Sequence, residues 1–171
     1  MFDLLRSVHF GDYELSCGER TKYLVDTAQI LRTKEAQDFV RTNCKIPSEW
    51  SYDKLGGPLS AADLLCPLLG ADEWFGVRNA PKCRGTDIGK ITGNFNRGDH
   101  VVLVEDVVTS GATLIKAIRE VIDHGGIVTG LYVFIERKDF NGRENIRKEF
   151  DWIPFFSRYR FMESMGGVTI V

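Results

Sequence analysis

The strongest constraint on the fold is an apolar run that ends in two acids and then passes into helical spacing. Residues 100–106 (HVVLVED) are apolar from the second position up to Glu105 and Asp106, which is typical of a strand buried on both faces of a parallel sheet. Residues 110–126 repeat apolar side chains at helical spacing and end at two glycines, and 127–137 (IVTGLYVFIER) form the next strand. Strand, helix and strand in this order predict a right-handed βαβ unit. We therefore expect an α/β fold with a central, mainly parallel sheet flanked by helices.

The rest of the chain supplies further strands and helices. We predict two short strands around a turn in 11–27, a helix over 28–44, a strand, a Gly-Gly-Pro turn and a helix over 52–70, a strand that begins at 74, a mobile glycine-rich loop over 83–97, and a helix and a final strand after 137. No internal repeat, low-complexity segment or linker divides the sequence. Because 171 residues can bury a substantial core, a single domain over 1–171 is the simplest organisation.

Composition excludes several classes of protein. A formal net charge of −2 gives no overall attraction to nucleic acid or to an anionic membrane, and no apolar run is long enough to span a bilayer. The N-terminal segment carries Asp3 and Arg6 among its apolar residues and lacks the features of a signal peptide. The four cysteines are widely and unevenly spaced, which favours scattered, reduced thiols over a metal site: Cys17, Cys44, Cys66 and Cys83. We expect a cytoplasmic protein.

The end of the strand at 100–106 has the chemistry of a sugar phosphate site. In an open α/β sheet, ligands bind at the carboxyl ends of the strands. The small residues of the turn at 109–113 (TSGAT) would let a phosphate approach their backbone N–H groups and the positive end of the next helix. Glu105 and Asp106 would repel a phosphate at contact distance, but they can accept hydrogen bonds from sugar hydroxyls. The pattern therefore suits a ligand with a phosphate at one end and a diol about a ribose ring away.

A simpler explanation also exists for these residues. Asp, Ser or Thr before a helix is commonly only an N-cap. The Walker A pattern and G-x-G-x-x-G are both missing from the sequence, which disfavours a P-loop kinase and a dinucleotide-binding enzyme. The combination of an apolar run, two acids and T-S-G-A-T favours a ligand-binding site over a simple N-cap.

The stretch VVLVEDVVTSGAT closely resembles the phosphoribosyl pyrophosphate (PRPP) binding motif of type I phosphoribosyltransferases. That resemblance implies that Glu105 and Asp106 contact the ribose 2′- and 3′-hydroxyls. It also implies that the turn cradles the 5-phosphate through Thr109, Ser110, Gly111, Ala112 and Thr113. The acids would hold the ribose, and the loop would hold its phosphate.

Two further segments narrow the resemblance to orotate phosphoribosyltransferases. FGDYELSCGERTKYLVD (10–26) is similar to their N-terminal segment, which implies a small hood over about 1–30 in front of a PRPP-binding core over 50–137. LGGPLSAADLL (55–65) resembles the segment that meets pyrophosphate, which implies this role for Gly56 and Gly57. A tight Gly-Pro turn before a helix is the competing explanation for Gly57.

A third similar segment is GVRNAPKCRG (76–85), where orotate enzymes carry a basic pattern at the root of a flexible loop. Arg78, Lys82 and Arg84 form a basic cluster suited to pyrophosphate, although a solvated basic loop is the usual fate of such residues. Asn79 and Arg84 replace a family lysine and histidine, and Lys90 is a candidate to compensate. By the same resemblance, Arg137 meets the orotate carboxylate at the end of its strand, and Thr109 contributes to the orotate site.

The implied reaction is Mg²⁺-dependent transfer of 5-phosphoribosyl from PRPP to orotate, which gives orotidine 5′-monophosphate and pyrophosphate in pyrimidine synthesis. Lys82 and Asp106 are the candidate catalytic residues, and Mg²⁺ would be held mainly by PRPP, without direct protein ligands. A homodimer with shared active sites is implied. Two alternatives stay open: transfer to another nucleobase such as a purine, and a non-catalytic PRPP-binding regulatory protein.

Overall fold

The computed structural model describes residues 3–15, 18–82, 89–164 and 167–171. Its strands are β1 (Val8–Glu14), β2 (Arg20–Val25), β3 (Lys54–Pro58), β4 (Trp74–Lys82), β5 (Gly89–Gly93), β6 (His100–Val108), β7 (Ile127–Arg137), β8 (Phe155–Ser164) and β9 (Gly167–Ile170). Its helices are the 3-10 helix η1 (Leu4–Ser7) and the α-helices α1 (Thr27–Leu31), α2 (Lys34–Asn43), α3 (Leu59–Leu65), α4 (Ala112–Asp123) and α5 (Gly142–Phe150).

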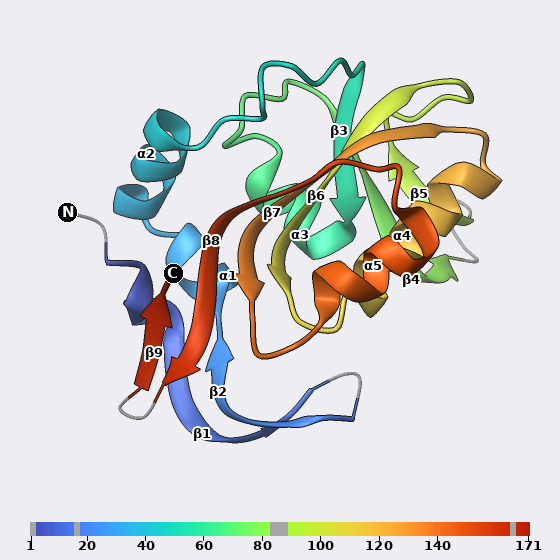
Figure 1. Cartoon of the computed structure of the whole chain (residues 1–171). Helices are drawn as coiled ribbons and strands as arrows, with labels where there is room; N and C mark the ends of the chain where they lie inside the picture. Colours follow the sequence, from blue (N-terminus) through green and yellow to red (C-terminus); the bar gives the residue numbers. More distant parts are fainter. Residues whose placement is uncertain (1–2, 16–17, 83–88, 165–166) are drawn as a thin grey trace.

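The centre of the described chain is a seven-stranded sheet in the order β5-β4-β3-β6-β7-β8-β9 (Figure 1). The neighbours from β4 through β8 pair in parallel, while β5 and β9 pair antiparallel at the two edges. The predicted βαβ unit is β6, α4 and β7, and β6 lies in the middle of the sheet. The prediction of an α/β fold with a central, mainly parallel sheet and flanking helices is confirmed.

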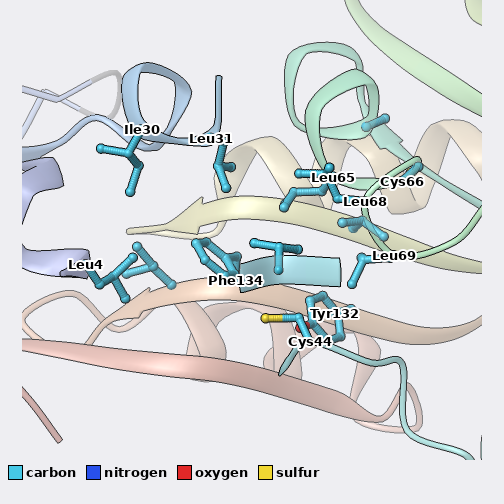
Figure 2. Packing of buried hydrophobic residues seen from close by; sticks show 14 of the residues in the cluster. Leu4, Ile30, Leu31, Cys44, Leu65, Cys66, Leu68, Leu69, Tyr132 and Phe134 are labelled. Carbon is cyan, nitrogen blue, oxygen red and sulfur yellow. The ribbon is translucent and has the colours of Figure 1, made fainter. Parts of the chain in front are cut away.

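Helices cover both faces of this sheet, so the molecule has three layers (Figure 1). On one face, α1, α2 and α3 pack against side chains that include Val102, Val104 and Phe134. Figure 2 shows part of this cluster, with Leu65 on α3 and Tyr132 beside Cys44. On the other face, α4 and α5 pack against the alternate strand residues, such as Leu103. A strand buried on both faces has no need of polar positions, which explains the unbroken apolar run that precedes Glu105.

The segment in which the sequence predicts a hood forms a separate small sheet. β1 and β2 pair antiparallel, with an irregularity between Phe10 and Tyr13. Burial alternates along β2, so that Thr21, Tyr23 and Val25 face the interior while Lys22 and Leu24 are exposed. This small sheet is continued by α1, whose N-cap Asp26 accepts a hydrogen bond from the Gln29 backbone N–H at 3.0 Å.

The helix predicted over 28–44 is instead two helices. Thr33 separates them, because its extended backbone breaks α1 and its hydroxyl caps α2 by accepting from the Ala36 N–H at 3.3 Å. Apolar spacing continues across this break, so periodicity alone could not reveal it.

The prediction of a loop over 83–97 is wrong for residues 89–93, which form the edge strand β5. Gly93 takes a φ of +86°, and a Cβ there would lie 2.6 Å from the Trp74 carbonyl oxygen. The glycines that suggested a loop therefore permit close pairing with β4. Beyond 137 the predicted helix and strand are α5 and β8, and the structure adds the edge strand β9, which the sequence analysis missed.

Two of the four cysteines lie in the described part of the chain. Cys44 and Cys66 are free and buried, and burial raises the pKa of both thiols. Cys17 and Cys83 lie outside the described residues. Within the described ranges, the helices are too short or too polar for any of them to cross a lipid bilayer.

Candidate active site

The carboxyl end of β6 and the start of α4 enclose a small recess of about 20 Å³. It is lined by Glu105 and by residues 107–114, which include all five of the predicted phosphate-binding positions. Gly111 precedes α4 with a φ of 80° and makes no side-chain cap. A Cβ on Gly111 would lie 2.8 Å from the Gly142 carbonyl oxygen, so only glycine fits. The recess meets the positive end of a 12-residue helix, which is a favourable place for a phosphate.

The N-terminal end of α5 supports this turn from behind. The Asn145 side-chain amide donates to the Ser110 carbonyl at 3.1 Å. A Cβ on Gly142 would lie 2.1 Å from the Thr109 carbonyl oxygen, so the two backbones approach as closely as glycine allows. The sequence analysis did not assign a role to these two residues. The Asn-Gly pair at 141–142 was the signal that the chain turns sharply there.

The two acids at the end of β6 have different surroundings. Glu105 is 5% exposed and faces the recess. Burial, reinforced by the charge of Asp106, raises the pKa of Glu105 well above its ordinary value. Asp106 is partly buried and faces the first turn of α1, where the Thr27 hydroxyl donates to Asp106 Oδ2. The backbone N–H of Val107 donates to the other carboxylate oxygen, Oδ1, at 2.9 Å.

Gly56 and Gly57 lie inside β3, next to β6, and not in a turn as the sequence predicted. A Cβ on Gly56 would lie 2.2 Å from the Phe75 ring, and a Cβ on Gly57 would lie 2.2 Å from the Val104 carbonyl oxygen. Pro58 ends the strand and α3 begins at once, so no turn is needed between them. The close approach of the neighbouring strands explains why both positions are glycine.

The predicted basic cluster is only partly described. Arg78 lies on β4 and lines a cavity of about 520 Å³ that is also bordered by Leu59, Asp63 and Trp74. Its Nη1 atom is buried and has no hydrogen-bond partner among the described residues. None of the residues of the turn at 109–113 borders that cavity, so the structure does not bring Arg78 to the recess of its own chain.

The other predicted cations divide as follows. Lys82 is the last residue of β4, and Arg84 lies outside the described residues. Lys90 on β5 donates to Glu120 of α4 at 2.6 Å, and this ion pair ties the edge of the sheet to the helix. Asn79 is an exposed residue of β4.

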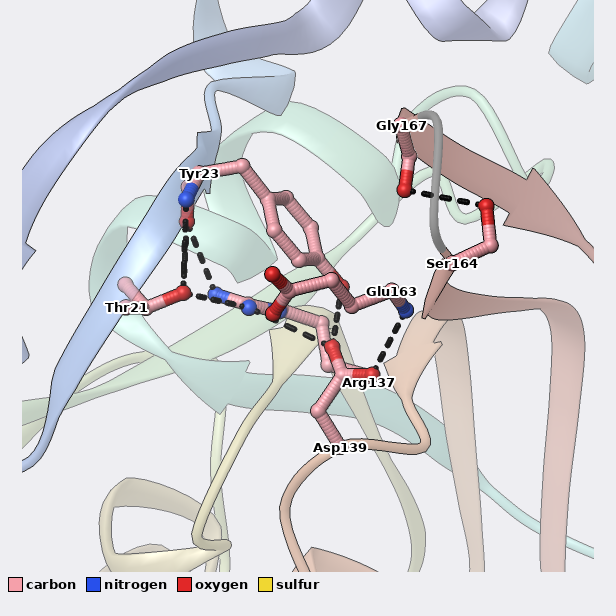
Figure 3. A network of polar contacts seen from close by, with 7 residues as sticks. All are labelled: Thr21, Tyr23, Arg137, Asp139, Glu163, Ser164 and Gly167. Atoms are coloured by element: carbon pink, nitrogen blue, oxygen red, sulfur yellow. Dashed lines mark hydrogen bonds and ion pairs between the residues drawn. The ribbon is translucent and has the colours of Figure 1, made fainter.

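Arg137 lies at the end of β7 and is 1% exposed (Figure 3). Its guanidinium donates to the Tyr23 carbonyl at 3.1 Å and to the Thr21 hydroxyl at 2.8 Å. It also lies 3.4 Å from the Asp139 carboxylate, which accepts from the Tyr23 hydroxyl and, at 2.7 Å, from the Glu163 backbone N–H. In the part of the chain that the structure describes, the buried Nε atom of Arg137 has no hydrogen-bond partner. Burial and the hydrogen bond to Asp139 raise the pKa of the Tyr23 phenol.

A cavity of about 390 Å³ adjoins this network, with Arg137 in its lining. Its other borders include Arg20, Lys22, Glu19 and Phe140, so it mixes cations, acids and an aromatic ring. Among the described residues, Thr109 lines the recess and not this cavity. The structure therefore separates the two residues that the sequence analysis assigned to orotate.

The sequence analysis missed the residues that join the small sheet to the core. Thr21, Tyr23 and Asp139 hold Arg137, and Thr27 contacts Asp106. Tyr23 stood in a quoted motif, but no spacing rule connects it with a residue more than 100 positions away. These contacts exist only because β2 folds over the ends of β6 and β7.

Comparisons with known proteins agree with this architecture. A family model described as a phosphoribosyl transferase domain matches residues 93–161. The orotate phosphoribosyltransferase of Pyrococcus horikoshii is 33% identical over 149 residues, which cover 83% of this chain and 78% of that protein. The orotate phosphoribosyltransferase of Aquifex aeolicus is 31% identical over 170 residues, which cover 92% and 91%.

The same likeness appears among solved structures. The crystal structure of Mycobacterium tuberculosis orotate phosphoribosyltransferase in complex with Fe(III) dicitrate superposes with a TM-score of 0.72 at 26% identity. The match covers 90% of each chain. The resemblance stated from the sequence motifs, and the fold that it implies, are confirmed.

Proposed function

The chain belongs to the orotate phosphoribosyltransferase family, and we propose that it transfers the 5-phosphoribosyl group of PRPP to orotate. Membership makes it an enzyme of PRPP-dependent phosphoribosyl transfer in pyrimidine synthesis. Beyond membership of the family, the proposal specifies orotate as the acceptor, and orotidine 5′-monophosphate and pyrophosphate as the products. One observation carries it: a recess at a helix N-terminus has two carboxylates at the end of the adjoining strand.

In this proposal the recess takes the 5-phosphate. Thr109, Ser110 and Thr113 supply hydroxyl donors, and Gly111 and Ala112 leave the backbone N–H groups accessible. Asp106 accepts a hydrogen bond from the ribose diol. Glu105, whose raised pKa favours the protonated carboxyl, can donate to one ribose hydroxyl while it accepts from another. Holding the ring in this way fixes the anomeric carbon for attack.

Arg137 supplies the cation for the acceptor base. A carboxylate that enters the cavity of about 390 Å³ meets a buried guanidinium, whose Nε N–H has no partner in the described chain. A charge-assisted hydrogen bond in such a buried place is stronger than one in water. This favours an acceptor base that carries a carboxylate, such as orotate, and disfavours a purine without one. Thr109 borders the recess, so we limit its role to the phosphate unless the substrates bring the two sites together.

The chemical step exchanges one bond at the anomeric carbon for another. The bond from C1 to the pyrophosphate oxygen breaks, the bond from C1 to the base nitrogen forms, and that nitrogen loses its proton. Positive charge develops on the ribose ring, so neutralising the departing pyrophosphate is the main electrostatic task. We assign this task to Lys82, with Arg78 and Arg84 as further cations for the pyrophosphate. Gly56 and Gly57 would form the backbone that meets pyrophosphate.

Mg²⁺ would add charge neutralisation on the pyrophosphate when it is bound with PRPP. The described residues contain no group of three His, Cys, Asp or Glu side chains placed to hold a metal. We propose that Mg²⁺ takes its ligands mainly from the phosphate oxygens of PRPP and from water, as Mg²⁺ commonly does.

We further propose a homodimer with shared active sites. Arg78 lines a cavity beside α3 and is not among the residues that line the recess of its own chain, which supports a role in the site of a second copy. In the same proposal, residues 1–30 are the hood, residues 50–137 are the PRPP-binding core, and the enzyme works in the cytoplasm on small molecules, without nucleic acid or membrane partners.

The test is pyrophosphate release by the purified chain with PRPP and Mg²⁺, in parallel reactions with orotate, uracil, hypoxanthine, adenine and no base. Release with orotate alone is the expected result. Release with a purine would keep the PRPP site and overturn the assignment of the base. PRPP binding without release for any base would favour the regulatory alternative, which rests on Asn79 and Arg84.

A further inference from the structure

Thr27 is a buried hydroxyl at a position where nothing in the packing of α1 requires one. It is the first residue of α1 and is 1% exposed. The N-cap of this helix is already supplied by the Asp26 side chain, which accepts from the Gln29 N–H. The Thr27 hydroxyl instead donates across 79 positions of sequence to Oδ2 of Asp106. The Thr27 hydroxyl therefore serves the contact with Asp106 and does not serve its own helix.

The contact leaves Asp106 able to bind a ligand. An ionised carboxylate offers about four acceptor positions on its two oxygens. Within the described chain, the Val107 N–H occupies one position on Oδ1 and the Thr27 hydroxyl occupies one on Oδ2. Two donors on different elements fix the plane of the carboxylate. Two acceptor positions remain for a sugar diol, so the contact orients the group without blocking it.

The same short segment also holds the group assigned to the base. Thr21 and Tyr23 bind the Arg137 guanidinium, and Thr27 binds Asp106. The segment 21–27 thus touches the two substrate-binding groups from one side. Asp26 anchors it to the end of η1, because its backbone N–H donates to the Ser7 carbonyl at 2.8 Å.

We propose that Thr27 is a positioning residue for phosphoribosyl transfer, which orients the Asp106 carboxylate toward the ribose diol and fastens the hood to the PRPP site. The inference rests on the proposed function, because it takes Asp106 as the ribose-binding group. It assigns a role to a residue that lies outside the PRPP motif and would not itself touch the substrate.

The experiment is a double-mutant cycle on PRPP binding, measured by titration calorimetry in the absence of any base. Thr27→Val keeps the shape of the side chain and removes the donor, and Thr27→Ser keeps the donor. We expect Thr27→Val to weaken PRPP binding by roughly tenfold, because the hydrogen bond goes to a charged group. In the Asp106→Asn background the same substitution should cost less than about twofold, since the carboxylate to be oriented is gone. Thr27→Ser should restore most of the affinity.

Thr129→Val is the matched control. Thr129 is partly buried on β7, and its hydroxyl donates to the Val101 carbonyl at 3.3 Å, far from Asp106 in the sheet register. It should leave PRPP binding unchanged. Equal losses from Thr27→Val in the two backgrounds, or no loss in either, would overturn the positioning role. Failure of the unmodified chain to bind PRPP would instead sink the proposed function, so the two failures are distinguishable.

Discussion

The guanidinium carbon of Arg137 lies 3.6 Å from the centroid of the Tyr23 ring, while the Tyr23 carbonyl accepts a hydrogen bond from the same guanidinium. One hood residue therefore contacts the arginine through both its ring and its backbone. The Phe140 ring lies 4.6 Å from the same carbon, so Arg137 is packed between two aromatic rings. A long side chain that would be free at an ordinary strand end is thereby held in one orientation, as the role proposed for Arg137 in binding the acceptor base requires.

Arg137→Lys should raise the orotate concentration needed for half-maximal rate by about a hundredfold, since the buried site loses the planar fork that a carboxylate matches. Steady-state kinetics with orotate varied at saturating PRPP checks this. PRPP binding should change little. Arg143→Lys is the control, because Arg143 makes a comparable buried pair with Glu136 at 2.5 Å but lies outside the cavity. It should lower thermal stability and leave the orotate requirement unchanged. An unaltered requirement in Arg137→Lys would refute the base assignment.

Gly111→Ala should weaken PRPP binding by at least tenfold and lower the free energy of unfolding by about 2–4 kcal/mol, because the new Cβ adds a clash to an unfavourable φ. The clash is with the Gly142 carbonyl oxygen at 2.8 Å. Gly70→Ala isolates the backbone effect, since Gly70 has a φ of +92° with nothing within 4 Å of the added Cβ. It should cost only about 1–2 kcal/mol and leave PRPP binding intact. Denaturant unfolding and PRPP titration of the two variants provide the comparison, and equal effects would argue against the tight turn.

Glu105→Gln should change how stability depends on pH. The pKa of Glu105 is raised in the folded state, so above its ordinary value of 4.5 the folded chain keeps a proton that the unfolded chain has lost. The contribution of Glu105 to stability is therefore full below that value and falls as pH rises, by up to about 1.4 kcal/mol per unit. Unfolding free energies measured from pH 5 to 8 should decline less in the glutamine variant.

Glu136→Gln, on the neighbouring strand β7, should have the opposite effect on how stability depends on pH. Burial opposes ionisation of Glu136, but hydrogen bonds from Arg143 and Ser157 prevail and hold its pKa below the ordinary value. Its stabilising contribution is present at neutral pH and is lost as the solution is acidified through the lowered folded value. The substitution should destabilise the protein most near neutrality. A parallel pH dependence for the two variants would contradict the assignment of a protonated Glu105.

Mixed dimers should test the shared active site. Lys82→Ala and Asp106→Asn are each expected to abolish most activity, one at the leaving group and one at the ribose. If Lys82 serves the partner's site, a mixed dimer of the two variants keeps one intact site. Refolding equal amounts together should then restore about a quarter of the wild-type activity, since about half of the dimers are mixed. Activity that stays at the level of the separate variants would place Lys82 and Asp106 in the same protomer's site, or in monomers.

Much of this protein followed from local sequence. The apolar run before Glu105 and the Thr-Ser-Gly-Ala-Thr turn determined the central strand, the next helix and the recess between them, because each depends on neighbours in the chain. β5 was taken for a loop, and the helix break at Thr33 was not foreseen. β5 forms because it pairs with β4, and the helix breaks where the Thr33 hydroxyl caps α2. Neither contact produces a periodic pattern in the sequence.

Only the tertiary structure decided how the two groups proposed to bind the substrates are held. Asp106 and Arg137 could be named from motifs, but their partners Thr27, Thr21 and Tyr23 come from a sheet that folds back over the core. Asp139 likewise gains its role only where β7, β2 and β8 meet. A motif records the residues that chemistry requires at a fixed spacing. Contacts between distant segments depend on how whole layers pack, and that packing is a property of the complete fold.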